Sequence, residues 1–292
     1  MFNRIKSELL NVGLKFISVD EKIVRMILET SSSNINELVI LPAIKTVMKK
    51  LLQKLQNKRS FGRVYNGELN GVKVSIVRSL IGAPNCAMAV EALKRSKVKV
   101  IIRIDVCGGI EGTITPVNIG NIIIPKSAFC GDGTCPQYFR EKPSLMNELD
   151  SISNPIGKFQ NIFMGNQTVF ISKPNDILKE ILYNTGISFL KDKVKLADLW
   201  TTDALFCESR DFIRALSSIN ITCVDMESSI LFLLGKIYNL KTSSILSVSD
   251  LPGHPKYDVF KSNEIHPDME NGIDNAIKIL IKSLPLIKNE LI

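Results

Sequence analysis

Short apolar runs recur along most of this chain, and helical patterns separate them. From Glu37 onward, such runs include residues 38–41, 98–104 and 243–249. An apolar run of about four to eight residues between helices is typical of a strand that is buried on both faces. The alternation therefore predicts an α/β protein of one domain, in which a central mixed β-sheet is flanked by helices.

Turn residues and helix-stop signals define further elements. Asn70-Gly71 joins residues 62–69 to residues 72–77, and Asn-Gly is the strongest two-residue hairpin signal. The chain closes with an amphipathic pattern over residues 268–284, and Pro285 is expected to end that helix. The other expected elements include a helix over residues 46–55 and a strand over residues 119–125.

The first 35 residues differ from the rest. Apolar residues recur there at helical spacing until residues 31–34, which are Ser-Ser-Ser-Asn, interrupt the pattern. The apolar positions are Ile5, Leu9, Leu10, Val12, Leu14, Val24, Ile27 and Leu28. We expect residues 1–35 to form an N-terminal helical extension and residues 36–292 to form the α/β domain. The pattern is amphipathic and no apolar run approaches about 18 residues, so neither a secretory signal nor a membrane span is expected.

Composition argues against several classes of function. Lys and Arg outnumber Asp and Glu, 37 to 29, but the lysines are scattered and form no basic run with interleaved aromatic residues. This favours a solvated basic surface over a nucleic-acid partner. The six cysteines form no C-x-x-C pair and the only histidines are His254 and His266, so no metal site is expected. Cysteines inside apolar runs favour a reducing compartment, and we expect a cytoplasmic protein.

Two carboxylates lie at a predicted strand-to-helix junction. An apolar run that ends at Val224 leads into Asp225-Met226-Glu227, and a helical apolar pattern follows at once. A helix N-terminus favours negative charge and offers free backbone N–H groups. Asp225 and Glu227 are therefore interpreted either as a helix cap with first-turn charge, or as acceptors for the neighbouring hydroxyls of a sugar.

Two further strand ends carry residues with binding chemistry. Gly82-Ala83-Pro84-Asn85 follows a β-rich run and opens a helix, where N–H groups can bind an anion, although such a junction needs these residues in any case. Arg103 stands inside a run of valines and isoleucines, and a buried arginine requires a partner. That partner is either an anionic ligand or an internal carboxylate, such as Asp105 or Asp132. Gly108-Gly109 fits a tight turn on either interpretation.

Asp250 ends the apolar run SSILSVSD and precedes Leu251-Pro252-Gly253. A carboxyl group at the end of a buried strand can have a raised pKa and act as a proton donor. The alternative is an aspartate that caps the Pro-Gly turn. Taken alone, the turn interpretation is the more common of the two.

These stretches together are more specific than any one of them. Arg103 with Cys107-Gly108-Gly109, then Thr202-Asp203-Ala204, Asp225-Met226-Glu227-Ser228 and Ser249-Asp250 follow one another along the α/β pattern. This order resembles the superfamily of purine nucleoside phosphorylases and uridine phosphorylases, which also includes the nucleosidases, over roughly residues 37–286. The segments GTCPQYF (residues 133–139), DMES and SDLPGH (residues 249–254) look most like the AMP nucleosidase branch.

The resemblance implies cleavage of an N-glycosidic bond. The backbone of Met226 and the carboxylate of Glu227 would hold the ribose 2′- and 3′-hydroxyls, and Glu227 would stabilise an oxocarbenium-like transition state. Asp250 would protonate N7 of a departing purine, and Arg103 would bind phosphate. The other positions implied in substrate binding are Asp225, Gly108, Gly82, and Leu205 and Phe206, which would line the base.

The phosphate site departs from the family pattern. A Gly-Asp-Pro turn with a nearby arginine would follow the first strand, but this chain has Leu41-Pro42-Ala43-Ile44. An arginine that reaches across from a neighbouring subunit falls at Asn66, a Ser or Thr beside the strand-end arginine falls at Val106, and a glycine falls at Leu80. Arg103 remains, with Arg78 as a substitute. Such losses should weaken phosphate binding, since each charge-assisted contact contributes about 1.5–3 kcal/mol.

Three functions are compatible with this sequence. The first is phosphorolysis of a purine nucleoside, with inorganic phosphate as co-substrate, no other cofactor and ribose 1-phosphate as product. The second is hydrolysis by a nucleosidase, and the third is nucleoside binding or a scaffold role without catalysis. A purine is favoured because Asp250 is present and because residues 207–210 lack the glutamine and arginine of the uridine branch. Family habit also implies a homo-oligomer, either a dimer or a hexamer.

Overall fold

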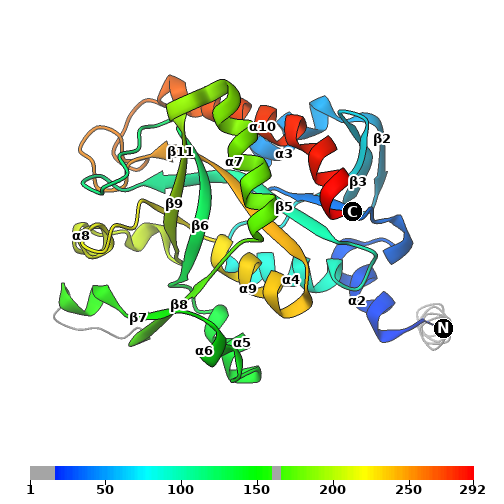
Figure 1. The fold of residues 1–292 in the computed structure, drawn as a ribbon, viewed down its shortest axis with the longest axis horizontal. Helices are drawn as coiled ribbons and strands as arrows, with labels where there is room; N and C mark the ends of the chain where they lie inside the picture. Colours follow the sequence, from blue (N-terminus) through cyan, green and yellow to red (C-terminus); the bar gives the residue numbers. More distant parts are fainter. Residues whose placement is uncertain (1–16, 160–165) are drawn as a thin grey trace, which may run out of the picture.

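A computed structural model describes residues 17–159 and 166–292, and in it strands and helices alternate along the chain (Figure 1). The strands are β1 Leu38–Leu41, β2 Gln56–Phe61, β3 Val64–Leu69, β4 Val72–Val77, β5 Val100–Gly109, β6 Ile122–Cys130, β7 Ser151–Ser153, β8 Thr168–Ser172, β9 Val194–Thr201, β10 Cys223–Asp225 and β11 Lys241–Asp250. The main helices are α2 Val19–Leu28, α3 Lys45–Lys54, α4 Ala83–Leu93, α5 Cys135–Glu141, α6 Leu145–Glu148, α7 Asp176–Leu190, α8 Arg210–Ser217, α9 Ser228–Tyr238 and α10 Pro267–Leu291.

The strands form one mixed sheet with the order β2-β3-β4-β1-β5-β10-β9-β6-β8-β7. Strand β11 lies parallel to β5 and antiparallel to β6, so β5, β10, β9, β6 and β11 close into a ring. This confirms the predicted α/β domain with a central mixed sheet. The closure brings the ends of β5, β10 and β11 next to one another, since Val224 pairs with Gly108 and Asp250 also pairs with Gly108.

Helices cover the sheet on two sides (Figure 1). On one side α3, α7 and α10 pack over a core that contains Val47, Leu182 and Leu280. On the other side α4 and α9 pack over a core that contains Val90 and Leu231. Residues 228–235 of α9 are all buried, which fits its continuous apolar pattern.

The predicted hairpin is confirmed, and two other expectations need correction. Asn70 and Gly71 have φ of 49° and 72°, as a type I′ turn between β3 and β4 requires. The strand expected over residues 119–125 lies further along, at β6. Gly108 and Gly109 do not form a turn but end strand β5. A Cβ atom at Gly108 would lie 2.7 Å from Cγ of Pro252, so close packing explains this glycine.

The predicted end of the last helix at Pro285 is wrong, because α10 continues to Leu291. Proline lacks the N–H that would bond to the carbonyl four residues earlier, which is that of Ile281. In the structure, the side-chain amide of Asn70 donates to the Ile281 carbonyl oxygen at 3.2 Å. Burial of Leu284 and Ile287 on either side of Pro285 also favours continuation of the helix.

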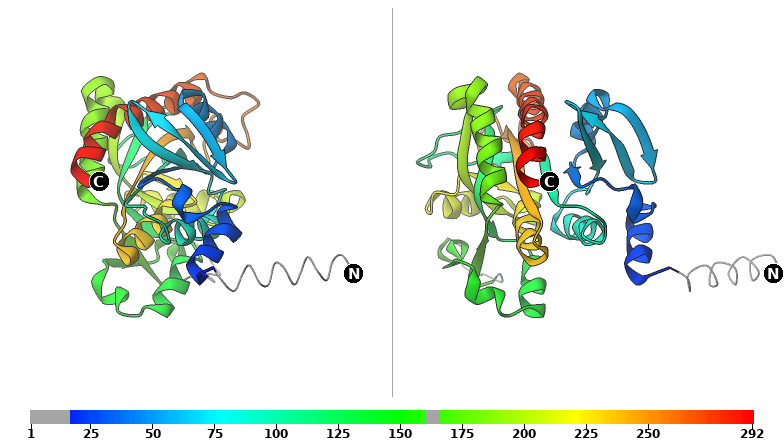
Figure 2. Two further views of the ribbon diagram at one scale, coloured as in Figure 1. Left: turned by 90° about the vertical axis from the view of Figure 1, so that its right-hand side faces the viewer. Right: turned by 45° about the vertical axis from the view of Figure 1, so that its right-hand side comes forward.

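The first described helix, α2, packs against α4 through buried Val24 and Leu28 (Figure 2). The apolar positions Ile5 to Leu14 that were expected to form a helix lie outside the described residues. Within residues 17–159 and 166–292, none of the helices combines the length and apolar character needed to cross a lipid bilayer.

Candidate functional site

A cavity of about 220 Å³ lies where β5, β10 and β11 end and where α9 begins. It brings together most of the side chains that the sequence singled out, although Arg103 and Asp250 are far apart in the chain. Its lining includes Arg103, Gly108, Leu205, Asp225, Met226, Glu227 and Asp250. Polar side chains beyond strand ends are typical of ligand sites in α/β proteins.

Arg103 is held by two carboxylates from the junction before α9. Its Nη1 lies 3.0 Å from Oδ2 of Asp225, and its Nη2 pairs with Oε2 of Glu227. All three side chains are buried. Arg103 is therefore in an internal ion network, but its partners are not the two proposed from the sequence. Burial opposes the charge on Arg103, and Glu227 and Asp225 raise its pKa, so the guanidinium stays protonated.

Asp225 caps α9 as well as pairing with Arg103. Its Oδ2 accepts a hydrogen bond from the N–H of Ser228 at 3.0 Å, which satisfies a free donor of the first turn. Its Oδ1 accepts from Oγ1 of Thr201 at 2.8 Å. Asp225 therefore does bind a free N–H at the start of α9, but the N-cap residue is Glu227, which does not lie in the first turn. Each oxygen of Asp225 already has a partner.

Glu227 lies between α9 and the loop before α4. The N–H of Gly82 donates to its Oε1 at 2.7 Å, and Arg103 pairs with its other oxygen. Gly82 has φ of 103°, a conformation that favours glycine, and this turn directs its N–H at the carboxylate. Burial raises the pKa of Glu227, and the Arg103 guanidinium opposes that shift. Two oxygens with one partner each leave lone pairs free to accept from ligand hydroxyls.

Asp250 lies at the end of β11 and lines the same cavity. Its Oδ1 accepts a hydrogen bond from Oγ of Ser249 at 2.7 Å. Burial raises the pKa of this carboxyl group, so its protonated form is more populated than in water. A second cavity, of about 360 Å³, is lined by the loop that includes Tyr257 and shares Ser249 and Asp250 with the first.

The sequence analysis did not identify two acidic residues of the cavity lining, Glu208 and Asp105, as site residues. Burial raises the pKa of Glu208 to about 8, and the neighbouring charges of Asp250 and Asp258 add to the shift. Asp105 accepts hydrogen bonds from the N–H groups of Ala43 and Ile44. The signal for Glu208 was its place just after Leu205-Phe206, and the signal for Asp105 was a charged residue two positions after Arg103 on the same face of a strand.

Some residues singled out from the sequence lie elsewhere. Phe206 is 85% exposed and packs on Phe260, with ring centroids 4.8 Å apart, whereas its neighbour Leu205 does line the cavity. Arg78 is outside the cavity lining, and its Nε donates to the carbonyl oxygen of Ala43 at 2.8 Å.

One group among the described residues has metal-binding chemistry. Ligand atoms of Cys130, Asp132 and Cys135 lie within 4.8 Å of one another. Both oxygens of Asp132 already accept hydrogen bonds, from the N–H groups that begin α5 and from Ser229. Burial raises the pKa of the Cys135 thiol, which opposes the thiolate form that binds metals. This arrangement favours a capped helix start over a metal centre.

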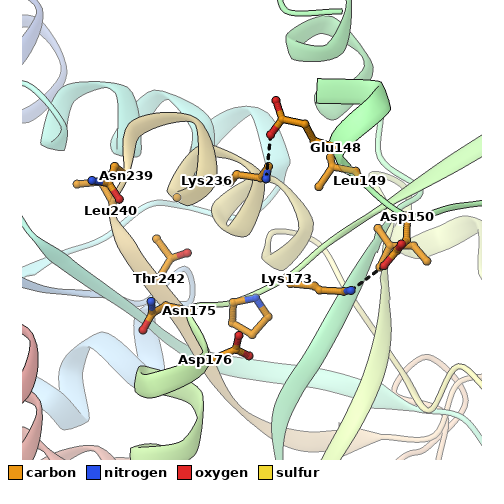
Figure 3. A pocket seen from close by; sticks show the side chains of 13 residues that line it. Glu148, Leu149, Asp150, Lys173, Asn175, Asp176, Lys236, Asn239, Leu240 and Thr242 are labelled. Carbon is orange, nitrogen blue, oxygen red and sulfur yellow. Dashed lines mark hydrogen bonds and ion pairs between the residues drawn. The ribbon is translucent and has the colours of Figure 1, made fainter. Parts of the chain in front are cut away.

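A third cavity, of about 390 Å³, lies at the opposite end of β11 (Figure 3). Its lysines are paired with acidic side chains, Lys236 with Glu148 at 3.1 Å and Lys173 with Asp150 at 2.6 Å. Thr242 lines this cavity, and Asp250 is eight residues further along the strand, which corresponds to about 26 Å. The paired charges and the distance separate this cavity from the candidate site.

Known proteins resemble this chain in sequence. The phosphorylase superfamily model matches residues 37–285. The guanosine phosphorylase of Halorubrum lacusprofundi is 19% identical over 76% of this chain and 80% of that protein. The DeoD-type purine nucleoside phosphorylase of Clostridium novyi is 28% identical over 64% of this chain and 67% of that protein.

Solved structures share the fold. The purine nucleoside phosphorylase of Toxoplasma gondii, in complex with immucillin-H, has a TM-score of 0.66 at 17% identity and covers 90% of this chain and 96% of its own. The uridine phosphorylase of Vibrio fischeri has a TM-score of 0.65 at 20% identity and covers 87% and 93%. Names for both purine and uridine enzymes appear among these proteins.

Proposed function

The chain belongs to the phosphorylase superfamily, a family of enzymes, and we propose that it cleaves the N-glycosidic bond of a purine nucleoside. The observation that carries this proposal is that Glu227 and Asp250 line one cavity. One carboxylate is then available to the sugar and one carboxyl group to the base. These are the two chemical roles that cleavage of this bond needs.

Glu227 acts on the sugar. Its free lone pairs accept hydrogen bonds from the ribose hydroxyls, and the backbone of Met226 lies beside it in the lining. As the bond to the base lengthens, positive charge develops on the sugar ring. A buried carboxylate stabilises that charge more strongly than it would in water, because the surroundings screen it less.

Asp250 acts on the leaving base. Its raised pKa favours the protonated acid, which can donate to a purine nitrogen as the bond breaks. Ser249 donates to Oδ1 and so orients the group. Glu208 lies in the same lining, where burial raises its pKa to about 8, and a neutral carboxylic acid there can both donate and accept hydrogen bonds at a purine edge. Two such acids favour purine over uracil, which has no nitrogen equivalent to N7.

The test is release of free base from inosine, guanosine, adenosine, AMP and uridine. We expect release from at least one purine substrate and a much slower reaction with uridine. A preference for uridine would contradict the proposed base, and absence of release from every substrate would contradict the proposed activity. Glu227→Gln should abolish turnover, whereas Glu180→Gln, a change in an exposed residue of α7, should leave it unchanged.

A further inference from the structure

The turn between β1 and α3 (residues 42–44), which we call the anion-binding turn, receives the buried carboxylate of Asp105. Helix α3 begins with N–H groups that no side chain of its own caps. Oδ2 of Asp105, from β5, accepts from the N–H of Ala43 and from the N–H of Ile44 at 3.3 Å. Free N–H groups at a helix start are the part of a protein backbone that binds phosphate and other anions. In this chain, an internal carboxylate accepts from the two N–H groups that immediately precede the helix, those of Ala43 and Ile44.

The backbone register explains why Asp105 reaches this turn. Strand β1 lies parallel to β5, with Leu41 opposite Arg103, so the residues after β1 lie beside Asp105. Side chains two residues apart on a strand point to the same face, which puts Arg103 and Asp105 on the face that borders the cavity. Asp105 is only 2% exposed, and its Oδ1 also accepts from the N–H of Val106.

The charges of the cavity also oppose an inorganic anion. Among the described residues that line it, Arg103 is the only cation, and both of its Nη atoms already have carboxylate partners. Five carboxyl groups line the same space: Asp105, Glu208, Asp225, Glu227 and Asp250. Like charges at short range in a buried space repel strongly. Even with Glu208 and Asp250 protonated, as proposed above, three carboxylates face one cation, so a phosphate dianion would meet a cavity of its own sign in which the N–H groups of Ala43 and Ile44 are already taken.

We propose that Asp105 permanently fills the anion-binding turn before α3, and that the enzyme therefore transfers the sugar to water and not to inorganic phosphate. This inference rests on the proposed nucleoside cleavage and adds the acceptor to it. Asp105 is the general base, because it lines the cavity together with Glu227 and, unlike Asp225 and Glu227, is not paired with Arg103. Burial raises the pKa of Asp105, which makes its ionised form a stronger base than a solvated aspartate.

The step has a simple balance. The oxygen of water forms a bond to C1′ of the sugar as the bond from C1′ to the base nitrogen breaks, and the bonding electron pair leaves with the base. The acid form of Asp250 gives its proton to the base. The carboxylate of Asp105 takes the proton that water loses. The products are free base and ribose, and exchange with solvent then removes the proton from Asp105 and returns one to Asp250, so no other reactant is consumed.

The first experiment identifies the sugar product of the wild-type enzyme. A purine nucleoside that is cleaved is incubated across a titration of inorganic phosphate, and ribose and ribose 1-phosphate are separated by chromatography. We expect ribose at every phosphate concentration and a rate that changes by less than about twofold. Ribose 1-phosphate formed only in the presence of phosphate would overturn this inference but leave nucleoside cleavage intact. No cleavage of any nucleoside would overturn both.

Two variants test Asp105 itself. Asp105→Asn keeps the shape and an oxygen acceptor for the turn but cannot take a proton, so kcat should fall by about 10²–10⁴-fold with little change in nucleoside affinity. Asp105→Gly empties the turn, so it should gain phosphate binding in calorimetry that the wild type lacks, and added formate should restore part of its hydrolysis. Asp198→Asn, on β9 and outside the cavity lining, is the matched control and should behave as the wild type. Phosphate binding by the wild type, or full activity of Asp105→Asn, would overturn the assignment.

Discussion

Arg103 and Glu227 form a buried ion pair across the candidate site, although 124 positions separate them in the chain. Strand β5 supplies the guanidinium, and the junction before α9 supplies the carboxylate. Asp225 completes the network from the same junction. One cation therefore compensates two buried carboxylates, which makes Arg103 a structural requirement for both.

Arg103→Met should destabilise the protein strongly. It leaves Asp225 and Glu227 buried without their counter-charge, and loss of one partner of a buried ion pair costs about 3–5 kcal/mol. Urea unfolding followed by fluorescence of Trp200 measures the change. The control is Arg214→Met, which removes an exposed pair with Asp211 and should cost no more than about 1 kcal/mol. Similar values for the two variants would contradict the network.

Asp250→Asn should slow base release much more than it weakens nucleoside binding. Asparagine keeps the shape of the side chain and can still accept from Ser249, but it has no acidic proton to give. We expect kcat to fall by about 10²–10⁴-fold, the usual contribution of general acid catalysis. Single-turnover release of base, with binding measured by calorimetry, separates the two effects. An unchanged rate would remove Asp250 from the role of acid.

Glu208 should make the free energy of unfolding decrease as the pH rises. Its pKa is raised from 4.5 to about 8 in the folded protein, so the fold holds a proton that the unfolded chain releases at a lower pH. The resulting stability is present in full below about pH 4.5 and is lost as the pH rises through about 8. Between these values, the free energy of unfolding of the wild type should fall relative to Glu208→Gln, by on the order of 2 kcal/mol after solvent screening. Parallel pH profiles of the two proteins would refute this.

Local sequence signals were sufficient for the elements whose cause is local. Asn70-Gly71 predicted its hairpin because both residues tolerate positive φ, and the apolar runs predicted buried strands because burial on both faces removes polar residues. The order of motifs along the chain predicted which strand ends share a cavity. Arg103, Glu227 and Asp250 do line one cavity.

The features that sequence reasoning missed depend on partners far away in the chain. Arg103 was assigned possible partners among nearby or similarly placed acids, but closure of the strand ring selects Asp225 and Glu227. The position of Asp105 on the turn after β1 likewise depends on the register between β1 and β5, which no local pattern specifies. The expectation that Pro285 ends α10 was wrong because the donor that replaces the missing N–H, the side-chain amide of Asn70, lies in a hairpin more than 200 positions earlier.

That compensation can be tested by Asn70→Gly. Glycine accepts the positive φ of the turn, so the variant removes the amide donor to the Ile281 carbonyl without straining the hairpin. We expect a loss of about 0.5–1.5 kcal/mol, the net contribution of one hydrogen bond. In a Pro285→Ala background, the restored N–H of residue 285 can bond to that carbonyl, so the same change should cost much less. A double-mutant cycle by urea unfolding gives the coupling, and a coupling energy near zero would mean that Asn70 does not support the helix at Pro285.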